Sequence, residues 1–174
     1  MDNPKMASYE IIASICLKIL KLFNNLGVLV LYRTGNGGDF LGIGGSWSLH
    51  EKHNPALEML ASGLFVGFII YTAVVIIGYC FGGSRTKRDL TDILMNAIGT
   101  AMWLAVGGVA MHYWLGYMSD GDFSYVSSER SVGIAMGALC IVQSALYLVD
   151  TILGCVLYYR GPMEYAVIRH YTLE

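Results

Sequence analysis

The amino-acid sequence predicts an all-α membrane protein, a bundle of four transmembrane helices with both termini in the cytoplasm and two small extracellular loops. Composition is the first observation: charged residues make up 14% of the chain and hydrophobic residues 55%, whereas soluble domains carry about 25% charged residues. The second observation is that the chain contains four apolar segments. The length of each is close to or above the roughly 20 residues that a helix needs to cross about 30 Å of hydrocarbon. The third is that polar residues gather in short connections between these segments, so the 174 residues form a single domain.

The longest apolar segment, residues 132–159, contains one acidic residue, Asp150, and no basic residue. An ionised carboxylate inside a membrane needs a partner on another helix. Asp150 lies nine residues before Tyr159, which is about 13 Å along a helix. This segment therefore predicts both a membrane helix and a buried ionic contact.

The first apolar segment, residues 11–32, supplies the partner. Its polar residues Ser14, Lys18, Lys21 and Asn25 are spaced four, three and four apart, which places them on one face of a helix. Lys18 and Lys21 lie about 10 and 15 Å from the start of the segment, close to the predicted depth of Asp150. We expect Asp150 to pair with Lys18 or Lys21. The pair fixes helix register, or the lysines reach the inner surface beside a neutral Asp150, or the three side chains form an ion or proton relay.

The second and third spans are predicted at residues 60–81 and 92–116. Small residues indicate where helices approach closely, because lipid provides no hydrophobic drive for helix association. A GxxxG motif occurs in the second span and another in the fourth. These motifs serve packing within the chain or contact with another membrane protein. The four glycines are Gly63, Gly67, Gly133 and Gly137.

Orientation follows from the positive-inside rule. With both termini inside, eight of the eleven Lys and Arg residues lie at the cytoplasmic ends of the spans. The extracellular loops are then residues 33–59 and 117–131. The cytoplasmic parts are the loop 82–91 and the tail 160–174.

Few residues suggest a catalytic, cofactor-binding or metal-binding site. No serine, cysteine or acid pair stands beside a plausible base, so we expect no enzyme activity and no cofactor. His50 and His53 lack the further ligands of a zinc site, so no metal site is expected. The net charge of −2 gives no indication of a nucleic-acid partner. The four cysteines all lie in or beside apolar segments, and Cys80 and Cys155 are candidates for acylation at the cytoplasmic side.

Five stretches of the chain resemble the snakeskin family of arthropod smooth septate junctions. They are LYRTGNGGDFLGIGGSWSL at residues 31–49, ASGLFVGFIIYT at 61–72, MWLAVGGVAMHYWLGYMSDGDF at 102–123, SERSVGIAMGALC at 128–140 and ALYLVDTILGC at 145–155. The resemblance covers roughly residues 11–159. It implies a non-enzymatic, multi-pass plasma-membrane component of lateral cell–cell junctions in epithelia.

The resemblance further implies assembly, with other junctional membrane proteins or as a homo-oligomer, into a paracellular barrier. The bilayer is the other expected partner. Two alternatives remain: a small ion or proton transporter or channel using the Asp150 level, and an auxiliary subunit of a larger membrane complex. Under the barrier interpretation the extracellular contact residues are expected to be Gly42, Gly44, Gly45, Trp47, Asp120 and Asp122.

Overall fold

The computed structural model describes residues 4–34, 55–81, 90–116 and 127–171, all of which are helical. The four helices are α1 (Pro4–Thr34), α2 (Pro55–Phe81), α3 (Leu90–Gly116) and α4 (Ser127–Tyr171). The described part of the chain contains no strand, and the prediction of an all-α membrane fold is confirmed. The predicted contact residues of the loops, from Gly42 to Trp47 and at Asp120 and Asp122, lie outside the described residues.

Each helix is long and apolar enough to cross a membrane, over Ile12–Tyr32, Met59–Phe81, Leu90–His112 and Ser131–Tyr159. In each of these segments, only 28 to 39% of the most apolar 18-residue stretch is buried against protein. The remainder points large hydrophobic side chains outward, including Phe23, Ile70, Leu104 and Ile152. Such a surface is stable against lipid rather than water, because lipid tails are as apolar as the side chains themselves.

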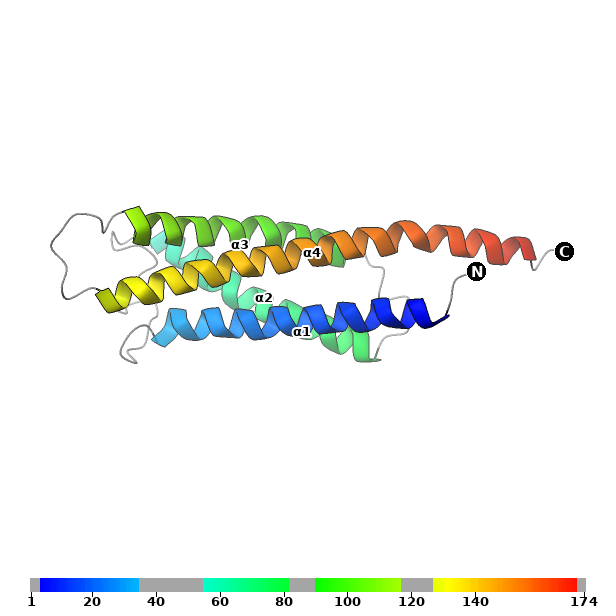
Figure 1. Cartoon of the computed structure of the whole chain (residues 1–174), viewed down its shortest axis with the longest axis horizontal. Helices are drawn as coiled ribbons and strands as arrows, with labels where there is room; N and C mark the ends of the chain where they lie inside the picture. The colour runs from blue at the N-terminus through cyan, green and yellow to red at the C-terminus, as the bar shows by residue number, and fades with distance from the viewer. Residues whose placement is uncertain (1–3, 35–54, 82–89, 117–126, 172–174) are drawn as a thin grey trace.

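The helices run side by side along the long axis, and α1 begins at the same end of the bundle at which α4 ends (Figure 1). The contacts between α3 and α4 are the most extensive, and α1 packs against both α2 and α4. The contacts between α2 and α3 are much fewer. The fourth helix continues past residue 159, where the sequence predicts the span to end, and reaches Tyr171.

Glycines explain why α3 and α4 fit so closely. A Cβ atom built on Gly133 would run into the indole ring of Trp114, and one on Gly137 would lie 2.9 Å from Met111 Cγ. On α3, a Cβ on Gly107 would lie 3.0 Å from Cys140 Cβ. These distances are too short for side chains, so the helices approach where glycine leaves room.

The GxxxG motif of α2, formed by Gly63 and Gly67, makes no such close contact. A Cβ on Gly63 or Gly67 would meet no described atom within 4 Å, and both residues are exposed. Of the two roles predicted for the motif, packing within the chain has no described contact at Gly63 and Gly67, and contact with another membrane protein stays a prediction. They line an open groove between α2 and α3, and the motif faces outward.

Aromatic rings fill the core toward the end of the bundle where α1 ends. The Phe65 ring stacks on Trp103 with centroids 5.2 Å apart, and Tyr32 meets Phe65 edge-on at the same separation. Phe68 meets Tyr147 edge-on, also at 5.2 Å. These arrangements are the favourable ones for aromatic pairs. We call this region, with Trp114 and Gly133, the aromatic end.

Candidate functional site: a buried ionic network

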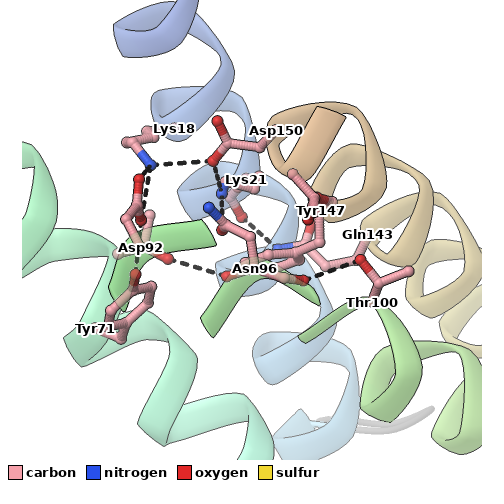
Figure 2. A network of polar contacts seen from close by, with 11 residues as sticks. Lys18, Lys21, Tyr71, Asp92, Asn96, Thr100, Gln143, Tyr147 and Asp150 are labelled. Carbon is pink, nitrogen blue, oxygen red and sulfur yellow. Dashed lines mark hydrogen bonds and ion pairs between the residues drawn. The ribbon is translucent and has the colours of Figure 1, made fainter. Parts of the chain in front are cut away.

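The opposite part of the core is polar. Two lysines from α1 meet one aspartate from α3 and another from α4, with Tyr71 of α2 beside them (Figure 2). We call the group Lys18, Lys21, Asp92 and Asp150 the ionic network. The two lysines are 1% exposed, and Asp150 is 4% exposed.

Lys18 joins the two aspartates. Its Nζ donates to Asp92 Oδ2 at 2.8 Å and Oδ1 at 3.2 Å, and to Asp150 Oδ2 at 3.0 Å. The ammonium also lies 5.3 Å from the centre of the Tyr79 ring. Since an ammonium group has three donors, these contacts use its full hydrogen-bonding capacity.

Lys21 lies one turn further along α1 and shares Asp150 with Lys18. Its Nζ donates to Asp150 Oδ2 and, at 2.9 Å, to Asn96 Oδ1. The same ammonium lies 4.1 Å from the centre of the Tyr147 ring, a distance at which a cation is attracted by the ring face. Each lysine therefore has an anionic partner and an aromatic neighbour.

Asp92 completes the charge balance. Its carboxylate accepts a hydrogen bond from the Tyr71 hydroxyl at 2.6 Å as well as from Lys18. The network contains two positive and two negative groups, so it carries no net charge when all are ionised. Buried charges are tolerated when they are paired and hydrogen-bonded, whereas removal of one partner leaves an uncompensated charge.

Amides and hydroxyls extend the polar core along α4. Gln143 Nε2 donates to the Lys21 carbonyl at 2.9 Å, and Asn24 Nδ2 donates to Gln143 Oε1 at 2.7 Å. Thr72 and Tyr147 share a hydrogen bond of 3.0 Å between their hydroxyls. All four helices are therefore linked by polar contacts at this level.

One member of the network, Asp92, lies close to the end of its helix, whereas the lysines and Asp150 lie further inside their spans. Asp92 is in the first turn of α3, only two residues, or about 3 Å, after Leu90. Its side chain is 17% exposed, whereas those of the lysines are at most 2% exposed. The two aspartates therefore have different surroundings: Asp150 is enclosed, and Asp92 lies nearer the edge.

Sequence reasoning left open which lysine meets Asp150, and the structure brings both to it. It missed Asp92, Asn96 and Tyr71. The signal for Asp92 was present as an acidic residue at the start of the third apolar segment, level with Lys18. The candidate acylation sites also differ, since Cys80 is exposed beside the end of α2, whereas Cys155 is half-buried within α4.

Among the described residues, the Asn25 amide stands apart because neither of its polar atoms has a hydrogen-bond partner, although the residue is 1% exposed. Asn25 lies one turn beyond Lys21 on α1. The described residues include no group of three or more His, Cys, Asp or Glu side chains arranged to hold a metal ion.

Fold and site together define the class: a multi-pass integral membrane protein of four helices joined by a buried ionic network. Its relatives identify the family. The chain is 54% identical over 160 residues to Protein snakeskin of Drosophila melanogaster, covering 92% of this chain and 99% of the relative. It is 48% identical over 151 residues to Protein snakeskin of Bombyx mori, covering 87% and 96% respectively. The chain therefore belongs to the snakeskin family. No family model and no solved structure matches it.

Proposed function

We propose that this protein is a non-enzymatic component of smooth septate junctions, where it assembles with itself and with partner membrane proteins to restrict leakage between epithelial cells. The identity of its relatives supports this proposal, since they align over nearly their whole length. The observation that carries the mechanism is the charge-balanced network, in which each of the two lysines is bonded to an aspartate. Such a network suits a bundle that keeps one shape and presents its loops for contact.

In this proposal both termini lie in the cytoplasm, and the loops at 33–59 and 117–131 face the intercellular space. The loop residues proposed for lateral or cell–cell contact are Gly42, Gly44, Gly45, Trp47, Asp120 and Asp122. The exposed Cys80 and half-buried Cys155 would then be accessible to acylation on the cytoplasmic side.

The test is electrical resistance across a polarised gut epithelial layer from which the protein has been depleted. We expect resistance to fall and a small uncharged tracer to leak, with recovery on re-expression of the wild-type chain. Staining of the tagged protein should concentrate at lateral cell–cell junctions. Unchanged resistance and tracer leak after complete depletion would contradict the barrier proposal.

Transport through the Asp150 level is the competing function. It predicts proton-dependent flux in liposomes containing the purified chain, lost in Asp150→Asn. We expect no such flux, because Lys18 and Lys21 both bond the same carboxylate oxygen and leave little capacity for a passing ion. Loss of flux in Asp150→Asn, with flux retained in the Thr72→Val control, would replace the barrier proposal with a transporter.

A further inference from the structure

Of the four membrane spans, α1 is the one with two charged side chains inside its apolar segment. The span Ile12–Tyr32 contains Lys18 and Lys21, whereas the span of α2 contains no Lys, Arg, Asp or Glu. The spans of α3 and α4 contain one charged residue each, Asp92 and Asp150. The free-energy cost of placing charge in lipid therefore falls mainly on α1.

The hydrophobic residues of α1 barely offset these two charges. Its span contains twelve Leu, Ile, Val and Phe residues. On membrane-insertion scales, one lysine near the middle of a helix cancels the contribution of roughly six such residues. Two lysines therefore cancel about twelve, which leaves α1 by itself with no net preference for the bilayer. Asn24 and Asn25 add further polar groups to the same helix.

Lys21 is the more costly of the two lysines because of its depth. It lies one residue from the middle of the Ile12–Tyr32 span, and Lys18 lies three residues nearer the start. A lysine near a helix end extends its side chain to the membrane surface more easily than one at the centre. In the folded chain neither ammonium does so, because both side chains are buried and point to aspartates (Figure 2).

The aspartates that balance the two lysines come from much later in the chain. Asp92 follows Lys18 by 74 residues, and Asp150 follows Lys21 by 129. Helix α1 is therefore synthesised before either partner, and its lysines lack both carboxylates until α3 and α4 are in place.

From this balance we propose that α1 is a conditional membrane span, one that stays across the bilayer only while Asp92 and Asp150 neutralise Lys18 and Lys21. The ionic network then sets how many spans the chain has, in addition to holding the finished bundle together. A chain whose α3 and α4 fail to reach the membrane would lose the α1 span, and its N-terminus and the loop 33–59 would lie on the same side. This dependence holds whichever side of the membrane the termini face.

The experiment uses the full-length chain, synthesised in the presence of microsomes, with one glycosylation site on each side of α1. One site is in a short tag added before Met1. The other is created by Gly44→Asn, which completes an Asn-Gly-Ser sequon with Gly45 and Ser46. When α1 spans the membrane, only one of the two sites is glycosylated. When it does not span, both sites are glycosylated or neither is.

We expect one glycan on nearly every chain that has these two sites and is otherwise wild type. The double variant Asp92→Leu with Asp150→Leu removes both anions. It should lower the single-glycan fraction about twofold, because α1 is left with no net preference for the bilayer. Both substitutions make their own helices more apolar, so α3 and α4 still span. Adding Lys18→Leu and Lys21→Leu should restore single glycosylation, although the ionic network is then absent.

Two further variants separate this effect from general misfolding. In the chain without the two aspartates, Lys21→Leu should restore more of the single-glycan fraction than Lys18→Leu, because Lys21 lies deeper in the span. The matched control is Gly133→Phe, which disturbs the contact of α4 with Trp114 of α3 and keeps all four charges. It should give the wild-type fraction.

Four results would contradict a conditional span. One is zero or two glycans on most wild-type chains, which would show that α1 does not span even with its partners. Another is a single-glycan fraction that is unchanged after both aspartates are replaced. The third is an equal loss in Gly133→Phe, which would make misfolding the cause. The last is a lack of recovery when all four charged residues are replaced, which would mean that charge is not what excludes α1 from the bilayer.

Discussion

The ionic network and the aromatic end show two ways of joining helices where the hydrophobic effect gives little help. At the network, specific charges on α1, α3 and α4 match, and the energy comes from pairing buried ions. At the aromatic end, Gly133 and Gly137 let α3 and α4 approach, and the energy comes from close contact. The first depends on chemical identity and the second on shape. Mutations in the two regions should therefore destabilise the bundle for different reasons.

The largest effect is expected from Asp150→Leu. This change leaves Lys21 buried with only Asn96 as a polar side-chain partner, and Lys18 with Asp92 alone. Breaking a buried ion pair typically costs about 3–5 kcal/mol. Unfolding of the purified chain in detergent, followed by circular dichroism against increasing denaturant, would measure it.

The control for this prediction is the double variant Asp150→Leu with Lys21→Met, which removes the charge left without an anion. It should recover a large part of the lost stability, because apolar replacement of a whole pair is often nearly neutral. A single variant as stable as the wild type would show that the network does not hold the bundle.

The next effect is steric and concerns the aromatic end. Gly133→Ala would force a methyl group into Trp114, and overpacking of this kind costs about 1–3 kcal/mol. The matched control is Gly108→Ala, where the added methyl group meets open space. The same unfolding measurement should show a loss for the first variant and none for the second. Equal effects would mean that the close fit between α3 and α4 is not a source of stability.

A smaller effect of opposite sign is expected at Asn25. Its amide is buried with no partner among the described residues, and a buried unpaired polar group costs about 1–3 kcal/mol. Asn25→Leu keeps the number of side-chain heavy atoms and the branch at Cγ and has no polar atom, so it should stabilise the bundle by about 1 kcal/mol. Destabilisation by Asn25→Leu would indicate that the amide does bond, for instance to a bound water.

The smallest effect is expected from the hydroxyl pair of Thr72 and Tyr147, which are 3.0 Å apart. Hydrogen bonds between membrane helices contribute about 0.6 kcal/mol on average. A double-mutant cycle with Thr72→Val and Tyr147→Phe should give a coupling energy of that order. A coupling above about 2 kcal/mol would place this contact with the ionic network rather than among ordinary helix contacts.

Much of this comparison could be predicted from the sequence, and the rest depends on how the helices turn toward one another. Lys18, Lys21 and Asp150 stood out because each is a charge deep in an apolar segment. Asp92 did not, because an acidic residue in a first helical turn is usually solvated there and its direction cannot be read from its position. The two GxxxG motifs have the same pattern, yet one meets Trp114 and Met111 and the other meets open space. Only the placement of neighbouring helices separates them.

The length of α4 has a mechanical consequence. One helix runs from Ser127 to Tyr171 and passes through the level of Asp150. Its twelve residues beyond Tyr159 reach about 18 Å past the last apolar stretch. A force applied to this protruding end of α4 is transmitted along the helix to Asp150, whose carboxylate bonds both lysines. Anything that tethers the end of α4 therefore pulls on the whole bundle.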